Sequence, residues 1–76
     1  MKIKLIDAYS SYREVRKEFE CTKDNIREVL KKINAEYDIC IDEVLDDLVE
    51  DLLNSAGYAE CEDYGGTSWI LELASS

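Results

Sequence analysis

The sequence has no histidine and no proline, and it has only three glycines and three cysteines in 76 residues. Without histidine, the commonest general base and a frequent zinc ligand are both missing. Cys21, Cys40 and Cys61 form no Cys-x-x-Cys pair, so we interpret them as reduced, partly buried thiols. No metal, cofactor or catalytic residue is predicted, and the chain is not expected to be an enzyme.

Long apolar runs are also absent, and none approaches the roughly 20 residues that a membrane-spanning helix needs. The apolar stretch at the N-terminus is too short for a secretion signal, and charged residues such as Lys2 and Lys4 interrupt it too early. A chain of 76 residues has room for one small domain, spanning 1–76, and no deep cleft between lobes. We expect a single cytoplasmic domain that does not contact membranes.

Positive charge is missing from the second part of the chain. No Lys or Arg follows Lys32, and 18 Asp and Glu against 9 Lys and Arg give a net charge of -9. Residues 1–32 sum to +3, whereas residues 33–76 sum to -12. Because phosphate contacts depend on clustered Lys and Arg, direct nucleic-acid binding is not expected. A partner should instead be basic or neutral.

The first part of the chain predicts one strand and two helices. Residues 2–6 alternate Lys with Ile and Leu, which indicates a strand with Ile3 and Leu5 facing inward. A first helix is predicted from about Ser11 to Glu20, because Ser11 and Glu14 have capping-box spacing. A second helix is predicted after Thr22, and residues 34–40 are predicted to be a connection. The apolar positions of the second helix are Ile26, Val29, Leu30 and Ile33.

A third helix is predicted from about Ile41 to Asn54, ending before Gly57. Its apolar side contains Ile41, Val44, Leu45, Leu48, Val49 and Leu52, and its other side contains six carboxylates. The segments YAECEDY and SWILELA then alternate as strands, and Gly65-Gly66-Thr67 can connect them as a hairpin.

The stretch LVEDLLNSAGYAECEDYGGTSWILEL resembles the end of a winged-helix domain, with a long amphipathic helix, a glycine and a hairpin whose second strand is aromatic and aliphatic. The resemblance implies an α+β fold of β-α-α-α-β-β order, with three helices against a small antiparallel sheet. In that family the third helix enters the DNA major groove and the hairpin contacts the backbone. Both elements are acidic here, so the resemblance implies the architecture without DNA binding.

Like charges recur on the third predicted helix at intervals of four residues, with no basic neighbour on that helix. Exposed helices usually mix signs at this spacing, since each opposite pair stabilises and each like pair destabilises. We therefore predict a partner-binding surface, although the same acids could serve only to keep the protein soluble. The candidate residues, including those of the hairpin, are Asp42, Glu43, Asp46, Asp47, Glu50, Asp51, Glu60, Glu62 and Asp63.

In size and acidity the chain resembles small phage or mobile-element inhibitors of the DNA-mimic and anti-CRISPR type. That resemblance implies a non-catalytic protein, a monomer or homodimer in the host cytoplasm, that blocks a basic, nucleic-acid-binding complex. The alternative is a winged-helix-like adaptor or dimerising regulator that uses apolar hairpin residues. The candidates for that role are Tyr58, Tyr64, Trp69 and Ile70, although Trp69 is more readily explained as core.

Overall fold

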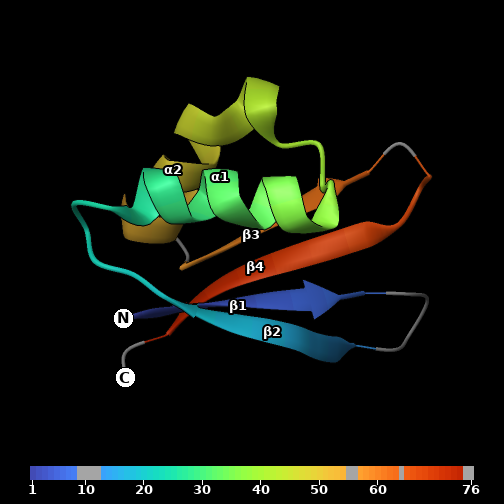
Figure 1. The fold of residues 1–76 in the computed structure, drawn as a ribbon, viewed down its shortest axis with the longest axis horizontal. Helices are drawn as coiled ribbons and strands as arrows, with labels where there is room; N and C mark the ends of the chain where they lie inside the picture. Colours follow the sequence, from blue (N-terminus) through green and yellow to red (C-terminus); the bar gives the residue numbers. More distant parts are fainter. Residues whose placement is uncertain (9–12, 55–56, 64, 75–76) are drawn as a thin grey trace.

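The computed structural model describes residues 1–8, 13–54, 57–63 and 65–74, in which two α-helices lie over one face of a four-stranded sheet (Figure 1). The elements are β1 (Lys2–Asp7), β2 (Glu14–Glu20), α1 (Ile26–Tyr37), a 3-10 helix η1 (Asp42–Val44), α2 (Leu45–Asn54), β3 (Tyr58–Glu62) and β4 (Ser68–Ala74). The sheet is antiparallel throughout, with strand order β2-β1-β4-β3.

The predicted winged-helix-like fold is wrong. The described residues contain two α-helices rather than three, and the order is β-β-α-α-β-β. The error lies in the first predicted helix, because Glu14–Glu20 is strand β2. Val15 and Phe19 fit the spacing of a helix, but the segment is short and contains β-branched and aromatic residues that also favour a strand. Ser11, its predicted cap, lies outside the described residues.

Pairing with β1 decides the conformation of β2. Phe19 lies opposite Ile3, and both side chains are buried. β1 is therefore a central strand, paired with β2 on one side and β4 on the other. The inward positions of Ile3 and Leu5, both fully buried, were predicted correctly.

Helix α1 begins and ends later than predicted. Thr22 and Asn25 exchange hydrogen bonds between side chain and backbone before the helix begins at Ile26. The helix continues through residues predicted as a connection and ends at Tyr37, whose ring packs edge-on against Phe19 and Trp69. These aromatic contacts bring the last turn of α1 onto the sheet, which local spacing could not indicate.

The third predicted helix is divided into η1 and α2. Asp38 and Cys40 both have positive φ angles, of 54° and 61°, so the chain turns sharply before η1. Ile41 is buried in this connection rather than within a helix, and Val44 is exposed. Helix α2 buries Leu48 and Leu52. It ends as predicted near Gly57, whose φ of 79° and N–H bond to the Asp51 carbonyl are typical of a helix stop.

The core lies between the helices and the sheet, and no helix of the described residues covers the opposite face of the sheet (Figure 1). The predicted β3–β4 hairpin is confirmed by their antiparallel pairing. Trp69 on β4 is only 8% exposed and belongs to the core. Side chains alternate along these strands, so one set faces the helices and the other faces outward.

Candidate protein-binding surface

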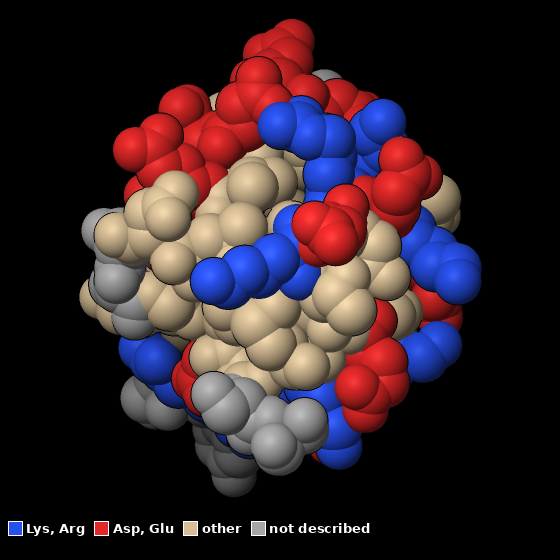
Figure 2. Space-filling model, turned by 90° about the vertical axis from the view of Figure 1, so that its left-hand side faces the viewer, with Lys and Arg blue, Asp and Glu red and all other residues tan. Residues whose placement is uncertain are grey.

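Six carboxylates project from η1 and α2, and together we call them the acidic helix surface. All six side chains are exposed, because the core-facing positions of the same segment are occupied by Leu48 and Leu52. Figure 2 shows acidic side chains gathered at the upper left of one face of the molecule, with basic side chains to their right. The residues of the surface are Asp42, Glu43, Asp46, Asp47, Glu50 and Asp51.

One basic residue reaches this surface from α1. Arg27 forms an ion pair with Asp46, and both side chains are substantially exposed. Within the described part of the chain, no other ion pair includes a residue of the acidic helix surface. The folded chain therefore neutralises one of the six charges and leaves the others available to solvent or a partner.

The structure brings Glu62, and also Asp38, to the edge of this surface. A hollow open to solvent is lined by Asp38, Cys40, Asp42, Glu43 and Glu62. Asp38 was missed by the sequence analysis, which placed it in an unspecified connection. The sequence offered one signal for Asp38, because Asp tolerates the left-handed backbone with which α1 ends.

Asn34 positions one side of this hollow. Its Nδ2 donates to Asp42 Oδ1 at 3.0 Å, and its Oδ1 accepts from the Ile41 N–H at 3.2 Å. The Asp38 N–H also donates to the Asn34 carbonyl, at 2.7 Å. One residue thus ties the end of α1 to the start of η1, a role that could not be recognised without the turn itself.

Glu60 lies away from the acidic helix surface. On β3 the alternating Ala59 and Cys61 pack against the core, so Glu60 points to the sheet face without helices. There it lines a second hollow, together with Arg13, Glu62, Ser68 and Ile70. The predicted acidic residues therefore divide between two faces of the molecule, and Glu62 lines hollows on both.

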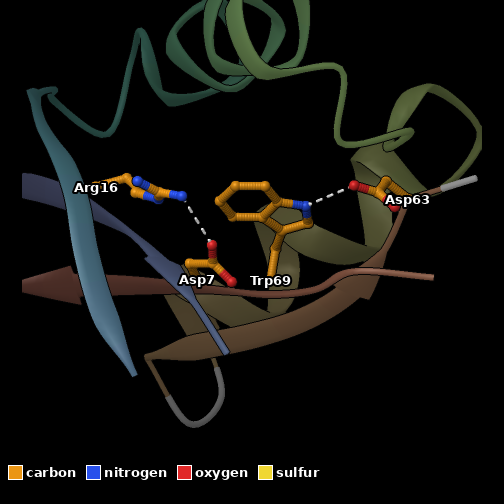
Figure 3. A network of polar contacts seen from close by, with 4 residues as sticks. All are labelled: Asp7, Arg16, Asp63 and Trp69. Atoms are coloured by element: carbon orange, nitrogen blue, oxygen red, sulfur yellow. Dashed lines mark hydrogen bonds and ion pairs between the residues drawn. The ribbon is translucent and has the colours of Figure 1, made fainter. Parts of the chain in front are cut away.

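Asp63 is engaged in the hairpin turn. Its Oδ1 accepts from the Gly65 and Thr67 N–H groups at 2.9 and 3.0 Å, and its Oδ2 accepts from Trp69 Nε1 at 3.1 Å (Figure 3). The indole hydrogen bond, followed by the Thr67 N–H, holds the pKa of Asp63 below its ordinary value. This carboxylate therefore orients Trp69 and the turn, rather than extending the acidic surface.

Asp7 also lies near Trp69, directly opposite it across the β1–β4 pair (Figure 3). Its Oδ2 accepts from Arg16 Nη2 at 3.2 Å, while its buried Oδ1 has no hydrogen-bond partner among the described residues. Neither Asp7 nor Arg16 was predicted from the sequence to belong to a functional site. Together these contacts place an ion pair and a hydrogen-bonded turn on either side of the core tryptophan.

The three cysteines are free thiols, with Cys21 buried and Cys40 and Cys61 half-buried. Burial raises the pKa of Cys61 to about 11, and the nearby charges of Asp63 and Cys40 act in the same direction. Such a thiol is protonated, and therefore unreactive, near neutral pH. Among the described residues, no group of three or more His, Cys, Asp or Glu is arranged to hold a metal ion.

The apolar residues proposed for an adaptor surface are mostly not accessible. Trp69 and Ile70 are 8% and 5% exposed, whereas Tyr58 is 51% exposed. Tyr64 lies outside the described residues. An apolar contact surface on the described part of the hairpin is thus reduced to Tyr58 alone.

No helix in the described ranges is long and apolar enough to cross a membrane. Comparison with protein-family models, curated proteins and solved structures finds no match to this chain.

Proposed function

We propose that this protein binds a basic, nucleic-acid-binding protein through the acidic helix surface and blocks it without catalysis. The observation that carries the proposal is the set of six exposed carboxylates on η1 and α2, of which one forms an ion pair within the described residues. Helical rise separates carboxylates four residues apart by about 6 Å along the axis. A partner that uses Lys and Arg to hold phosphates could hold this regularly spaced charge instead.

The fold supplies no additional argument, because the acids do not lie on a winged helix. The proposal rests on the location and accessibility of charge. An RNA-guided effector complex, which holds nucleic acid in a positively charged channel, belongs to the proposed partner class. The protein would then act in the cytoplasm of a host cell, as a phage-encoded anti-CRISPR or DNA-mimic inhibitor.

Displacement of labelled DNA from purified CRISPR effector complexes tests the proposal. We expect the wild-type protein to displace DNA from at least one complex, and the displacement to weaken steeply as salt is raised. The triple variant Asp47→Lys/Glu50→Lys/Asp51→Lys should lose this activity. These positions are chosen because none of them pairs with a base within the described residues.

The matched control is Glu14→Lys/Glu18→Lys/Glu72→Lys, which changes the net charge equally on strands β2 and β4. Its three side chains are exposed, and they lie outside both the acidic helix surface and strand β3. Retention of displacement by this control, with loss in the α2 variant, supports the acidic helix surface. Equal loss in both variants, or full activity in the α2 variant, would refute it.

A further inference from the structure

Among the described residues, no strand pairs with the outer edge of β3, since β3 is the last strand of the sheet on the side opposite β2. The Leu73 N–H donates to the Gly57 carbonyl, and the Asp63 N–H donates to the Thr67 carbonyl. Alternate residues of an antiparallel strand direct their backbone groups to the same neighbour. Ala59 and Cys61 therefore face β4 with their backbone groups, while those of Tyr58, Glu60 and Glu62 face the outer edge.

The two edges of the sheet differ in their protection against strand addition. The pairing of β2 with β1 shifts register between Leu5 and Ile6 of β1, so β2 has one extra residue, Arg16, at a bulge. Lys17 follows this bulge. Bulges and basic side chains are common means of blocking an edge. The β3–β4 register contains no such shift, and β3 contains neither Lys, Arg nor Pro. The edge of β3 is thus regular and open to a further strand.

Carboxylates lie on both sides of this edge. Glu60 and Glu62 line the hollow on the sheet face without helices, and Glu62 also lines the hollow that contains Asp38, Asp42 and Glu43. In the described part of the chain, Arg13 is the one basic residue that lines either hollow. An added strand at β3 would therefore meet an excess of negative charge.

We propose that the outer edge of β3 binds an extended, Lys- and Arg-rich segment of a protein partner as a fifth strand of the sheet. The backbone groups of Tyr58, Glu60 and Glu62 would pair with the segment, and its basic side chains would lie beside the carboxylates. A second copy of this chain is the wrong occupant, because two antiparallel β3 strands centred on Glu60 would oppose like charges. The inference rests on the proposed function only for the charge of the partner.

Hydrogen exchange of the full chain, with and without a synthetic peptide of alternating Lys and Val, tests this proposal. We expect the amides of Tyr58, Glu60 and Glu62 to exchange roughly tenfold more slowly, or slower still, when the peptide is bound. The amides of Ala59 and Cys61, which already face β4, should change much less. Absence of this alternating protection while the peptide is bound would overturn the proposal.

A control peptide with every backbone N–H methylated has the same side-chain charge but lacks the backbone donors that strand addition needs. It should bind at least about tenfold more weakly, and equal binding would show that charge attraction alone is responsible. Glu60→Lys/Glu62→Lys should abolish binding, whereas the equally charged Glu14→Lys/Glu18→Lys on β2 should preserve it.

The variant Asp47→Lys/Glu50→Lys/Asp51→Lys separates this inference from the proposed function. Peptide binding that survives in this variant supports the β3 edge, whatever the outcome of the displacement experiment. Binding that is lost in this variant but retained in Glu60→Lys/Glu62→Lys would assign the peptide to α2 and exclude the edge.

Discussion

At the scale of single residues, Asp63 has a structural role that its charge alone would not suggest. Its carboxylate accepts hydrogen bonds from two backbone N–H groups and from the indole of Trp69, a core residue. The lowered pKa of Asp63 means that the folded state favours the charged form. Its stabilisation is therefore present above the ordinary Asp pKa of about 3.9 and is lost as the pH falls through the lowered value.

We predict that Asp63→Asn lowers the free energy of unfolding at pH 7, because Asn provides an acceptor without charge. Urea unfolding followed by Trp69 fluorescence measures the difference. The difference in unfolding free energy between wild type and variant should narrow as the pH falls from 7 through the lowered pKa of Asp63, because the native carboxyl then also becomes neutral. A difference in unfolding free energy that stays constant over this pH range would contradict the role assigned to Asp63.

Cys61 provides a second test at this scale. Because burial raises the pKa of Cys61 to about 11, its thiolate fraction should rise about tenfold per pH unit through pH 9 without levelling off. Iodoacetamide alkylation of the Cys21→Ala/Cys40→Ala variant, followed by mass spectrometry, measures this rate. A cysteine in an unstructured model peptide should level off above its pKa of about 8.5. A plateau for Cys61 near that same pH would show that the thiol is not buried as described.

At the scale of elements, α2 combines an apolar side that folds the domain with an acidic side that opposes helix stability. Asp46 and Glu50 form a like-charged pair four residues apart, as do Asp47 and Asp51. Glu50 also lies near the helix end where the macrodipole favours positive charge. The helix is held by burial of Leu48 and Leu52, so its acidic side is not explained by folding.

We predict that Glu50→Lys stabilises the domain by a few tenths to about 1 kcal/mol, because it replaces repulsion from Asp46 with attraction and suits the helix end. Thermal unfolding measures this change. The stability of the neutral Glu50→Gln variant should lie between those of the wild type and Glu50→Lys. The same substitution should weaken partner binding under the proposed function. A destabilised Glu50→Lys protein would mean that Glu50 makes a favourable contact in the folded state.

At the scale of the whole molecule, the net charge of -9 is divided between the helical layer and the edge of the sheet around β3. Ion pairs such as Lys2–Glu20 and Lys17–Glu36 join exposed side chains, and each contributes little. Repulsion among the excess carboxylates should therefore dominate the response of stability to salt.

Raising NaCl from about 10 mM to about 150 mM shortens the screening length from roughly 30 Å to about 8 Å. We expect the melting temperature to rise over this range, as measured by circular dichroism. The Glu50→Lys protein should show a smaller rise, since it has less repulsion to screen. A falling melting temperature would indicate that ion pairs outweigh the repulsion.

Regular, amphipathic patterns predicted their elements well. Alternation identified β1 and the β3–β4 hairpin, and helical spacing identified the buried residues of α1. Residues 14–20 were predicted wrongly because their short pattern fits two periods, and the partner that selects one of them is β1. The surface acids of α2 were predictable from spacing, whereas Asp38 and Asn34 depend on a turn that has no periodic pattern.

The sequence by itself determined the asymmetry of charge and the separation of acidic from apolar positions on α2, because both follow from residue order and helical geometry. Only the tertiary structure decided which acids share a surface. Strand pairing turned Glu60 to the face without helices, the hairpin turn engaged Asp63, and the α1–η1 connection brought Asp38 towards Glu62. These outcomes depend on contacts between segments distant in sequence, and local periodicity contains no information about them.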